Sequence, residues 1–279
     1  MLALSTDSLR GYGLNRIFQI IKDAGFDGVD LAMDPRNFDT MNATYIAALS
    51  EQVGIPVLSV SAPIHSNARN IKMAVDIAKK TGARIVVVQP PKFFDYKFIS
   101  WMKNEIPKMR QKENLSIALE NAPSKSFFGI IPEHAMGNIL DLKKFKHACI
   151  DTARLGKRKE DVIRVYNTLK KYLVHVHLSN LRAGTPYAPP EKGVIPLESF
   201  LTKLKQDQFP GVISLKVNGK FLHAGDDEKL MKSLAEQKLF YDTYFTNVKI
   251  MKSAENADPE EGASASETTP AANDQNQAQ

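Results

Sequence analysis

Eight short apolar runs alternate with amphipathic stretches along the first 245 residues of the chain. The runs are rich in Val, Ile and Leu, and several are nearly continuous in apolar character, as parallel strands covered on both faces are. They lie at 2–7, 28–33, 57–63, 84–90, 116–121, 147–152, 173–180 and 212–218. The stretches between them carry apolar residues at helical spacing, and several end at a glycine. Helices are expected at 14–24, 44–53, 71–80, 98–112, 159–171, 197–206 and 227–244.

Eight strand–helix alternations in one domain-sized chain predict an α/β fold, a (β/α)₈ TIM barrel over residues 1–250. A nucleotide-binding open sheet is disfavoured, because no Gly-rich phosphate loop follows the first predicted strand. The link between the fifth and sixth strands is the least regular; it holds Phe127–Pro132 and a weaker helical stretch. Residues 251–279 are expected to form a separate acidic, low-complexity tail. From Glu255 onward the chain has no aromatic or large aliphatic residue, so this tail is predicted to be disordered.

Composition narrows the class of protein. The 43% hydrophobic content suits one large α/β domain. A single cysteine, Cys149, excludes an internal disulfide and suits a reducing compartment, and neither a signal peptide nor a membrane span is recognised. We therefore expect a cytoplasmic protein without a membrane partner; the sequence leaves a homo-oligomer open. All 37 basic residues but only 25 of the 31 acidic residues precede Glu255, which gives that part a net charge of +12. Such a charge attracts anionic ligands, although no dense Arg/Lys block points to nucleic acid.

Four chemically distinctive residues end the last four predicted strands. They are Glu120, Asp151, His177 and Lys216, at intervals of 31, 26 and 39 residues. In a parallel barrel the carboxyl ends of the strands meet at one mouth, where active sites lie. Two carboxylates and an imidazole are ligands for a divalent cation. The fourth residue is a lysine, which is itself a cation and cannot bind a metal while it is protonated.

The motifs at these strand ends resemble those of the xylose isomerase-like TIM barrels, a superfamily of sugar and sugar-phosphate isomerases and epimerases that also includes endonuclease IV. The resemblance covers roughly residues 1–245. It depends on the order of STDS, GFDGVDL, ALEN, CIDTAR, HVHLSN, KGVIP and ISLKVN along the chain. It implies a metal site in which Glu120, Asp151 and His177 match family ligands.

The match to that metal site is partial. Lys216 stands where the family has a glutamate ligand, Arg154 where it often has a histidine, and Gln89 where multinuclear members have a histidine. Asn180 replaces an acidic residue that commonly follows the seventh-strand histidine. A divalent metal (Mn, Mg, Zn or Co) beside an ammonium faces Coulomb repulsion of about 8 kcal/mol at roughly 4 Å and an effective dielectric near 20. We therefore favour a site without a metal cofactor, in which Lys216 holds Glu120 and Asp151 as a salt-bridged cluster.

Three of these residues are the catalytic candidates: Glu120 and Asp151 as proton shuttles, and Lys216 as a base or Schiff-base former. The substrate-binding candidates are His177, His65, Arg154, Asn180 and Gln89. Asp7 and Asp30 are candidates for binding sugar hydroxyls or capping helices, and His175 for a second core layer. Several aromatic residues are candidates for stacking on a sugar ring or for packing: Phe93, Phe94, Trp101 and Tyr187.

These observations predict a sugar or sugar-phosphate isomerase/epimerase-like protein with a degenerate, metal-free site. The alternative is a non-catalytic barrel that binds a small metabolite. An endonuclease IV-like nuclease is disfavoured, because Gln89, Arg154 and Lys216 displace most of the metal cluster that such an enzyme needs.

Overall fold

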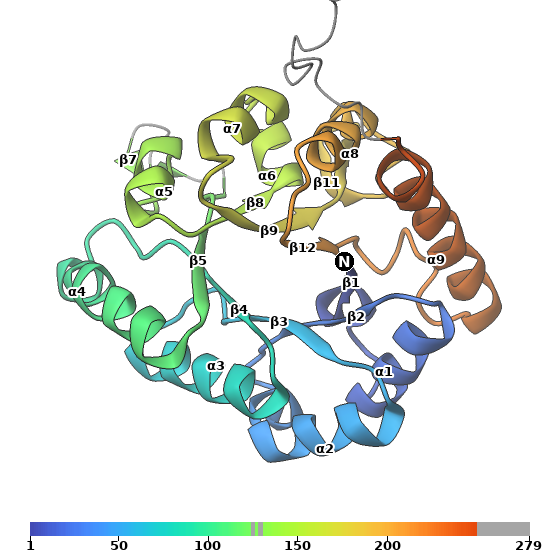
Figure 1. The fold of residues 1–279 in the computed structure, drawn as a ribbon, viewed down its shortest axis with the longest axis horizontal. Coiled ribbons are helices and arrows are strands. Elements are labelled where there is room, and N and C mark those ends of the chain that lie inside the picture. The colour runs from blue at the N-terminus through green and yellow to red at the C-terminus, as the bar shows by residue number, and fades with distance from the viewer. Residues whose placement is uncertain (124–125, 128–130, 250–279) are drawn as a thin grey trace, which may run out of the picture. The chain divides into compact units, whose positions relative to one another are not determined.

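A closed barrel of parallel strands forms the centre of the computed structural model, which describes residues 1–123, 126–127 and 131–249. Its eight strands within these residues follow one another in the order β1-β12-β9-β8-β5-β4-β3-β2 (Figure 1). They are Leu2–Ser5 (β1), Gly28–Ala32 (β2), Val57–Ser61 (β3), Ile85–Val88 (β4), Ser116–Glu120 (β5), Ala148–Asp151 (β8), Leu173–Leu178 (β9) and Val212–Leu215 (β12). Each predicted strand is present, and the (β/α)₈ prediction is confirmed.

Helices surround this barrel on the outside (Figure 1). Seven of them fall on predicted helical stretches: Leu14–Asp23 (α1), Ala43–Val53 (α2), Ala68–Thr81 (α3), Tyr96–Glu113 (α4), Val162–Leu169 (α7), Leu197–Gln206 (α8) and Asp227–Tyr241 (α9). The weak stretch after the fifth barrel strand is Ile139–Phe145 (α5), and Thr152–Lys157 (α6) was not predicted. Short hairpins lie between strands, Ser126–Phe127 with Ile131–Pro132 (β6 and β7) and Asn180–Arg182 with Thr185–Ala188 (β10 and β11).

Side-chain caps and glycines set the ends of these helices. The side chains of Asn42, Asn67 and Asp95 accept hydrogen bonds from the first turns of α2, α3 and α4. Gly54 and Gly82 end α2 and α3 with φ angles of 71° and 77°, in the left-handed region that glycine adopts without a steric penalty. The glycine stops predicted from the sequence are therefore present.

The register of the barrel brings polar residues from different strands into contact. Asp151 lies beside His177, and His177 lies beside Ser214 on the next strand. Glu120 ends β5 and is paired with Cys149 of β8. Most other residues of the barrel strands are buried and apolar. These polar side chains therefore form a small polar cluster that is surrounded by aliphatic residues.

Two further predictions from the sequence concern a membrane span and the end of the chain. Among the helices of the described residues, none has the length and apolar character that crossing a membrane requires. The predicted disordered tail, residues 251–279, lies outside the described residues.

Candidate active site

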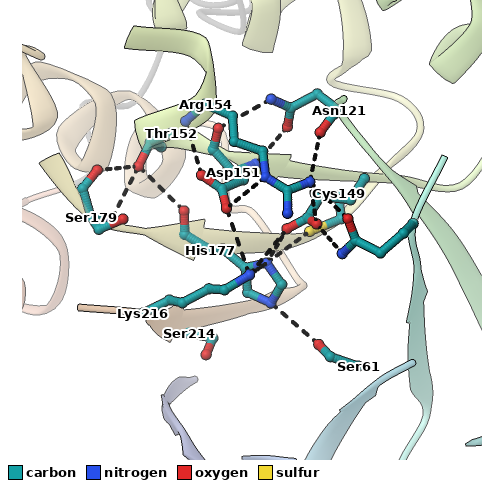
Figure 2. A network of polar contacts seen from close by, with 12 residues as sticks. Ser61, Asn121, Cys149, Asp151, Thr152, Arg154, His177, Ser179, Ser214 and Lys216 are labelled. Atoms are coloured by element: carbon teal, nitrogen blue, oxygen red, sulfur yellow. Dashed lines mark hydrogen bonds and ion pairs between the residues drawn. The ribbon is translucent and has the colours of Figure 1, made fainter. Parts of the chain in front are cut away.

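The four strand-end residues meet at one mouth of the barrel, as predicted. The Lys216 ammonium lies 3.6 Å from Glu120 Oε1 and 3.6 Å from Asp151 Oδ2 (Figure 2). Its third neighbour is His177 Nδ1, at 3.4 Å. All three distances exceed the 2.7–2.9 Å that is usual for a charge-assisted hydrogen bond. Lys216 is thus attracted electrostatically by two carboxylates but forms a short hydrogen bond with neither.

Arg154 is a second cation in the same cluster. Its Nη1 lies 2.7 Å from Glu120 Oε2, and its Nε lies 3.4 Å from Asp151 Oδ2. Nη1 also donates to the Gln89 side-chain oxygen at 2.9 Å, and Gln89 Nε2 donates a short hydrogen bond to Glu120 Oε2. Arg154 therefore pairs with both carboxylates. Gln89 and Arg154, two of the predicted substrate-binding residues, therefore also hold the carboxylates in place.

His177 connects this cluster to a third carboxylate. Its Nδ1 makes a short contact with Glu120 Oε1, and its Nε2 lies 3.3 Å from Asp30 Oδ2. Burial and the Lys216 charge oppose protonation of the ring, but Cys149, Glu120 and the hydrogen bond to Asp30 raise the pKa of His177 well above its usual range. An imidazolium donates from both nitrogens, which matches a carboxylate on each side.

Asp30 is buried below His177 and is surrounded by hydroxyl groups. Ser59 and Ser214 donate to its two oxygens at 2.8 Å, and Ser61 donates at 3.3 Å. Burial opposes ionisation of this carboxyl, yet the hydrogen bond and charge of His177 hold its pKa well below the usual range. Full burial keeps Asp30 from direct contact with a bound sugar, and its oxygens face Ser59, Ser214 and His177 and not the first turn of a described helix.

The cluster therefore contains three carboxylates and three cations. Burial opposes the charged forms of Glu120 and Lys216, but their opposite-charge neighbours outweigh it. The pKa of Glu120 is well below its usual range, and the pKa of Lys216 is well above its own. The ionised cluster is close to electrically neutral, which is the condition under which buried charges are tolerated.

Two sets of side chains have the spacing of metal ligands. Ligand atoms of Glu120, Asp151 and His177 lie within 4.8 Å of one another, and so do those of Cys149, His175 and His177. Both groups need a lone pair on His177, so a protonated ring would have to lose a proton before it could bind a metal. The carboxylates of the first group already face the Lys216 and Arg154 cations. A divalent cation bound here would have to displace these ion contacts.

Cys149, on β8, and His175, on β9, are both buried beside His177 of β9. Cys149 Sγ is 3.8 Å from His177 Nδ1, and burial raises the pKa of this thiol. The His175 ring packs edge-on against the His177 ring, with centroids 4.8 Å apart. Burial, then the His177 charge, lowers the pKa of His175 to about 3, so that its ring is neutral. This placement agrees with the core role expected for His175.

A cavity of about 470 Å³ opens above the cluster. Gln89, Arg154, Tyr187 and Lys216 contribute to its wall, together with side chains from the loops after β1 and β12. The Tyr187 ring centroid lies 5.8 Å from Lys216 Nζ. Glu120, Asp151 and His177 are not among the lining residues. A bound molecule therefore meets the two cations first, with the carboxylates behind them.

Two predicted substrate-binding residues lie elsewhere. His65 is exposed and does not line the cavity. Both ends of the Asn180 amide are used by the backbone: Nδ2 donates to Pro190 and Ile195 carbonyls, and Oδ1 accepts from Leu181 and Ile195. Asn180 thus fixes the loop before α8. Of the aromatic candidates only Tyr187 lines the cavity; Trp101 stacks on Phe98 within α4.

The sequence reasoning missed the serines around Asp30. Ser59 and Ser61 are two residues apart on β3, a spacing that places both side chains on the same face of a strand. Such a spacing of serines indicates a hydrogen-bonding partner for a buried aspartate when one is expected on the neighbouring strand.

Asn121 was also missed. Its side-chain oxygen accepts a hydrogen bond from the Asp151 amide at 2.7 Å and so fixes the end of β8.

Comparisons with known proteins agree with this architecture. An uncharacterised protein of Mycobacterium leprae is 22% identical over 281 residues, which cover 87% of this chain and 97% of that protein. D-psicose 3-epimerase of Clostridium cellulolyticum H10, solved with D-tagatose, has a TM-score of 0.66 at 15% identity, covering 87% of this chain and 98% of that one. The IolI protein with a bound zinc atom also has a TM-score of 0.66 at 15% identity, covering 88% and 99%. Residues 18–237 match the sequence profile of one family, and the chain therefore belongs to the xylose isomerase-like TIM barrels.

Proposed function

We propose that this protein is a sugar or sugar-phosphate isomerase/epimerase-like barrel whose site works without a divalent metal. One observation carries the proposal: the Lys216 ammonium lies 3.6 Å from both Glu120 and Asp151, between the carboxylates that would otherwise hold an ion. The names of similar structures, among them D-psicose 3-epimerase and L-ribulose 3-epimerase, support a carbohydrate ligand.

The two cations have the chemistry to bind the carbonyl or hydroxyl oxygens of a sugar. Lys216 and Arg154 both line the cavity, and the long contacts of Lys216 leave its N–H groups able to turn toward a ligand oxygen. A cation next to a carbonyl oxygen stabilises the negative charge that develops when a neighbouring C–H loses its proton. Gln89 and Tyr187, in the same wall, offer further hydrogen bonds.

A proton shuttle is also needed, and Asp151 is the best-placed carboxylate. Its Oδ2 is buried without a hydrogen bond and has only the ion contacts with Arg154 and Lys216. Both oxygens of Glu120 are engaged, by His177 on one side and by Gln89 and Arg154 on the other. Lys216 is held protonated by its neighbours, which argues against its acting as a base or a Schiff-base former.

The second candidate is a barrel that binds a sugar without converting it. The position of the carboxylates favours this reading, because Glu120 and Asp151 lie behind the cations and do not line the cavity. A nuclease is not supported, since Gln89, Arg154 and Lys216 contact the carboxylates where a metal cluster would require ligands.

Hydrogen exchange separates the two candidates. Purified protein is incubated with ketoses and ketose phosphates in D₂O with excess chelator, and NMR follows both binding and loss of the proton next to the carbonyl. Exchange that survives the chelator and disappears in Asp151→Asn supports a metal-free epimerase-like enzyme. Saturable binding without exchange supports the binding barrel, and exchange that needs added metal refutes the proposal.

Metal analysis tests the role of Lys216 directly. We expect the wild-type protein to contain far less than one Mn, Mg, Zn or Co per chain, and chelator to leave its melting temperature unchanged. Lys216→Glu exchanges a cation for a carboxylate and should gain metal affinity, whereas the neutral Lys216→Gln should gain less. Stoichiometric, tightly bound metal in the wild-type protein would contradict the proposal.

A further inference from the structure

Arg110, on α4, is a partly buried cation at the opposite end of the barrel. Its Nε and Nη2 donate to the Ile117 carbonyl at 3.0 and 2.6 Å, and its Nη1 donates to the Phe145 carbonyl at 2.7 Å. Carbonyl groups satisfy these donors without cancelling the charge. Burial lowers the pKa of Arg110 to about 10. The guanidinium lies over the Phe145 ring, 4.4 Å from its centroid, and the ion pairs found among the described residues do not include Arg110. A positive charge here lacks its counter-charge.

Two cavities adjoin at this guanidinium. One of about 430 Å³ and one of about 400 Å³ share Pro107 and Arg110 in their walls. The smaller cavity is bordered by Arg84, just before β4, and by His147, just before β8. The residues that border it therefore lie at the amino-terminal ends of the strands, away from the carboxyl-terminal mouth that holds Lys216. The larger one, called the Arg110 cavity below, lies between α4 and α5.

The Arg110 cavity combines a basic rim with an apolar wall. Its basic side chains are Lys103, Arg110, Lys144 and Lys146, and its one acidic residue is Asp141. The apolar part consists of Pro107, Met136 and Phe145. The excess of three positive charges attracts a dianion more strongly than a monoanion. The apolar wall favours a ligand that also carries a hydrophobic group, and the volume lies in the range of small-molecule sites.

The backbone around this cavity is held in an uncommon conformation. Met136 and Lys146 have φ angles of 59° and 72°, in the left-handed region that non-glycine residues rarely adopt. At Lys146 this conformation ends α5, where its N–H donates to the Leu142 and Lys143 carbonyls. Met136 lies outside the described helices, and such conformations are enriched at ligand sites. Both residues line the Arg110 cavity.

We propose that the Arg110 cavity binds a small phosphate monoester that carries an apolar ring, such as a mononucleotide. The phosphate lies against Lys144, Lys146 and Arg110 and supplies the missing counter-charge. The ring packs on Met136 and the neighbouring apolar wall. This site is separate from the sugar site proposed above and does not depend on it.

Binding of adenosine 5′-monophosphate, adenosine and inorganic phosphate to the full chain tests the proposal. Calorimetry and ligand-observed NMR at constant ionic strength give the dissociation constants. The monophosphate should bind with a Kd below about 1 mM. Adenosine and phosphate alone should each bind at least about tenfold more weakly, because each makes only half of the contacts.

A matched pair of variants locates the site. Lys144→Gln/Lys146→Gln removes two exposed cations of the Arg110 cavity and should weaken binding of the monophosphate at least about tenfold. Lys192→Gln/Lys232→Gln removes two exposed cations from a different cavity and should leave the Kd within about twofold. Equal weakening in both variants, no binding by the wild-type protein, or phosphate alone binding as tightly as the monophosphate would each overturn the proposal. Equal melting temperatures of the two variants exclude misfolding as the cause.

Discussion

Lys216 places a cation 3.6 Å from both Glu120 and Asp151. Unlike a bound ion, which a chelator can remove, this ammonium is covalently part of the chain just after β12. Its position between the carboxylates was predicted from the sequence, since strand-end residues of a parallel barrel converge and opposite charges pair. That Arg154 contacts both carboxylates at once could not be read from the sequence, because it depends on the local path of the chain after Asp151.

The two neighbouring histidines should show opposite protonation states at neutral pH. ¹⁵N NMR of the imidazole rings should report His177 as an imidazolium and His175 as neutral, with His175 unchanged down to roughly pH 4. Because the folded pKa of His177 is raised, its stabilising effect is complete below the unfolded pKa of about 6.5 and is lost as the pH rises through the folded value. The free energy of unfolding should therefore decline as the pH is raised above about 6.5. In His177→Gln this decline should be smaller; an equal decline in both proteins would contradict a charged His177.

Removing the Lys216 cation should destabilise the protein by about 3 kcal/mol, because two buried carboxylates lose a shared partner. Urea denaturation of Lys216→Ala and wild-type protein at pH 7 measures the difference. Lowering the pH should narrow it, since protonation of a carboxylate removes the repulsion that the variant suffers. The wild-type protein itself loses the contribution of Glu120 only as the pH falls below the unfolded pKa of about 4.3. Lys192→Ala, at an exposed position, serves as the control and should change stability by less than about 0.5 kcal/mol.

At the scale of elements, the sequence predicted each barrel strand and seven helices but missed α6. This helix has only six residues and begins at Thr152, which the apolar pattern assigned to the sixth predicted strand. Its N-cap is Asp151 itself, whose Oδ1 accepts a hydrogen bond from the Arg154 amide at 3.0 Å. Asp151 thus caps α6 with Oδ1 and faces the Lys216 and Arg154 cations with Oδ2. The apolar pattern of the strand does not indicate the capping role. The cradle of Asp30 was missed for a related reason: it draws on β3 and β12, whose neighbours become known only when the barrel closes.

Substitutions at Asp151 separate these two roles. Asp151→Asn keeps an oxygen for the cap but removes the charge, whereas Asp151→Ala removes both. We expect Asp151→Ala to be less stable than Asp151→Asn by about 1 kcal/mol, the usual contribution of an N-cap side chain. Thermal and urea denaturation measure the difference. Equal stability of the two variants would show that the cap contributes nothing to α6.

At the scale of the whole molecule, the barrel places different chemistry at its two ends. β5 and β8 carry Glu120 and Asp151 at their carboxyl ends, while Ser116 and His147 at or just before their amino ends border the smaller cavity beside Arg110. The mouth is close to charge-neutral, because carboxylates and cations pair there. The Arg110 cavity has unpaired positive charge. The residues that border the Arg110 cavity therefore carry a local excess of positive charge that composition alone does not reveal.

The barrel should fold without the acidic segment at the end of the chain. From Glu255 onward the sequence has six acidic residues, no basic residue and no large apolar side chain, so it offers little surface to bury in a core. The described barrel has a buried aliphatic core within residues 1–249. A chain that ends at Lys252 should therefore have the melting temperature of the full chain within error, measured by calorimetry at equal concentration.

Because the tail is acidic and the rest of the chain is basic, the comparison should be repeated at high salt, which screens attraction between them. A lower melting temperature of the truncated chain that disappears at high salt would reveal electrostatic docking of the tail. A decrease that persists at high salt would mean that the tail packs against the barrel through contacts that its composition does not predict.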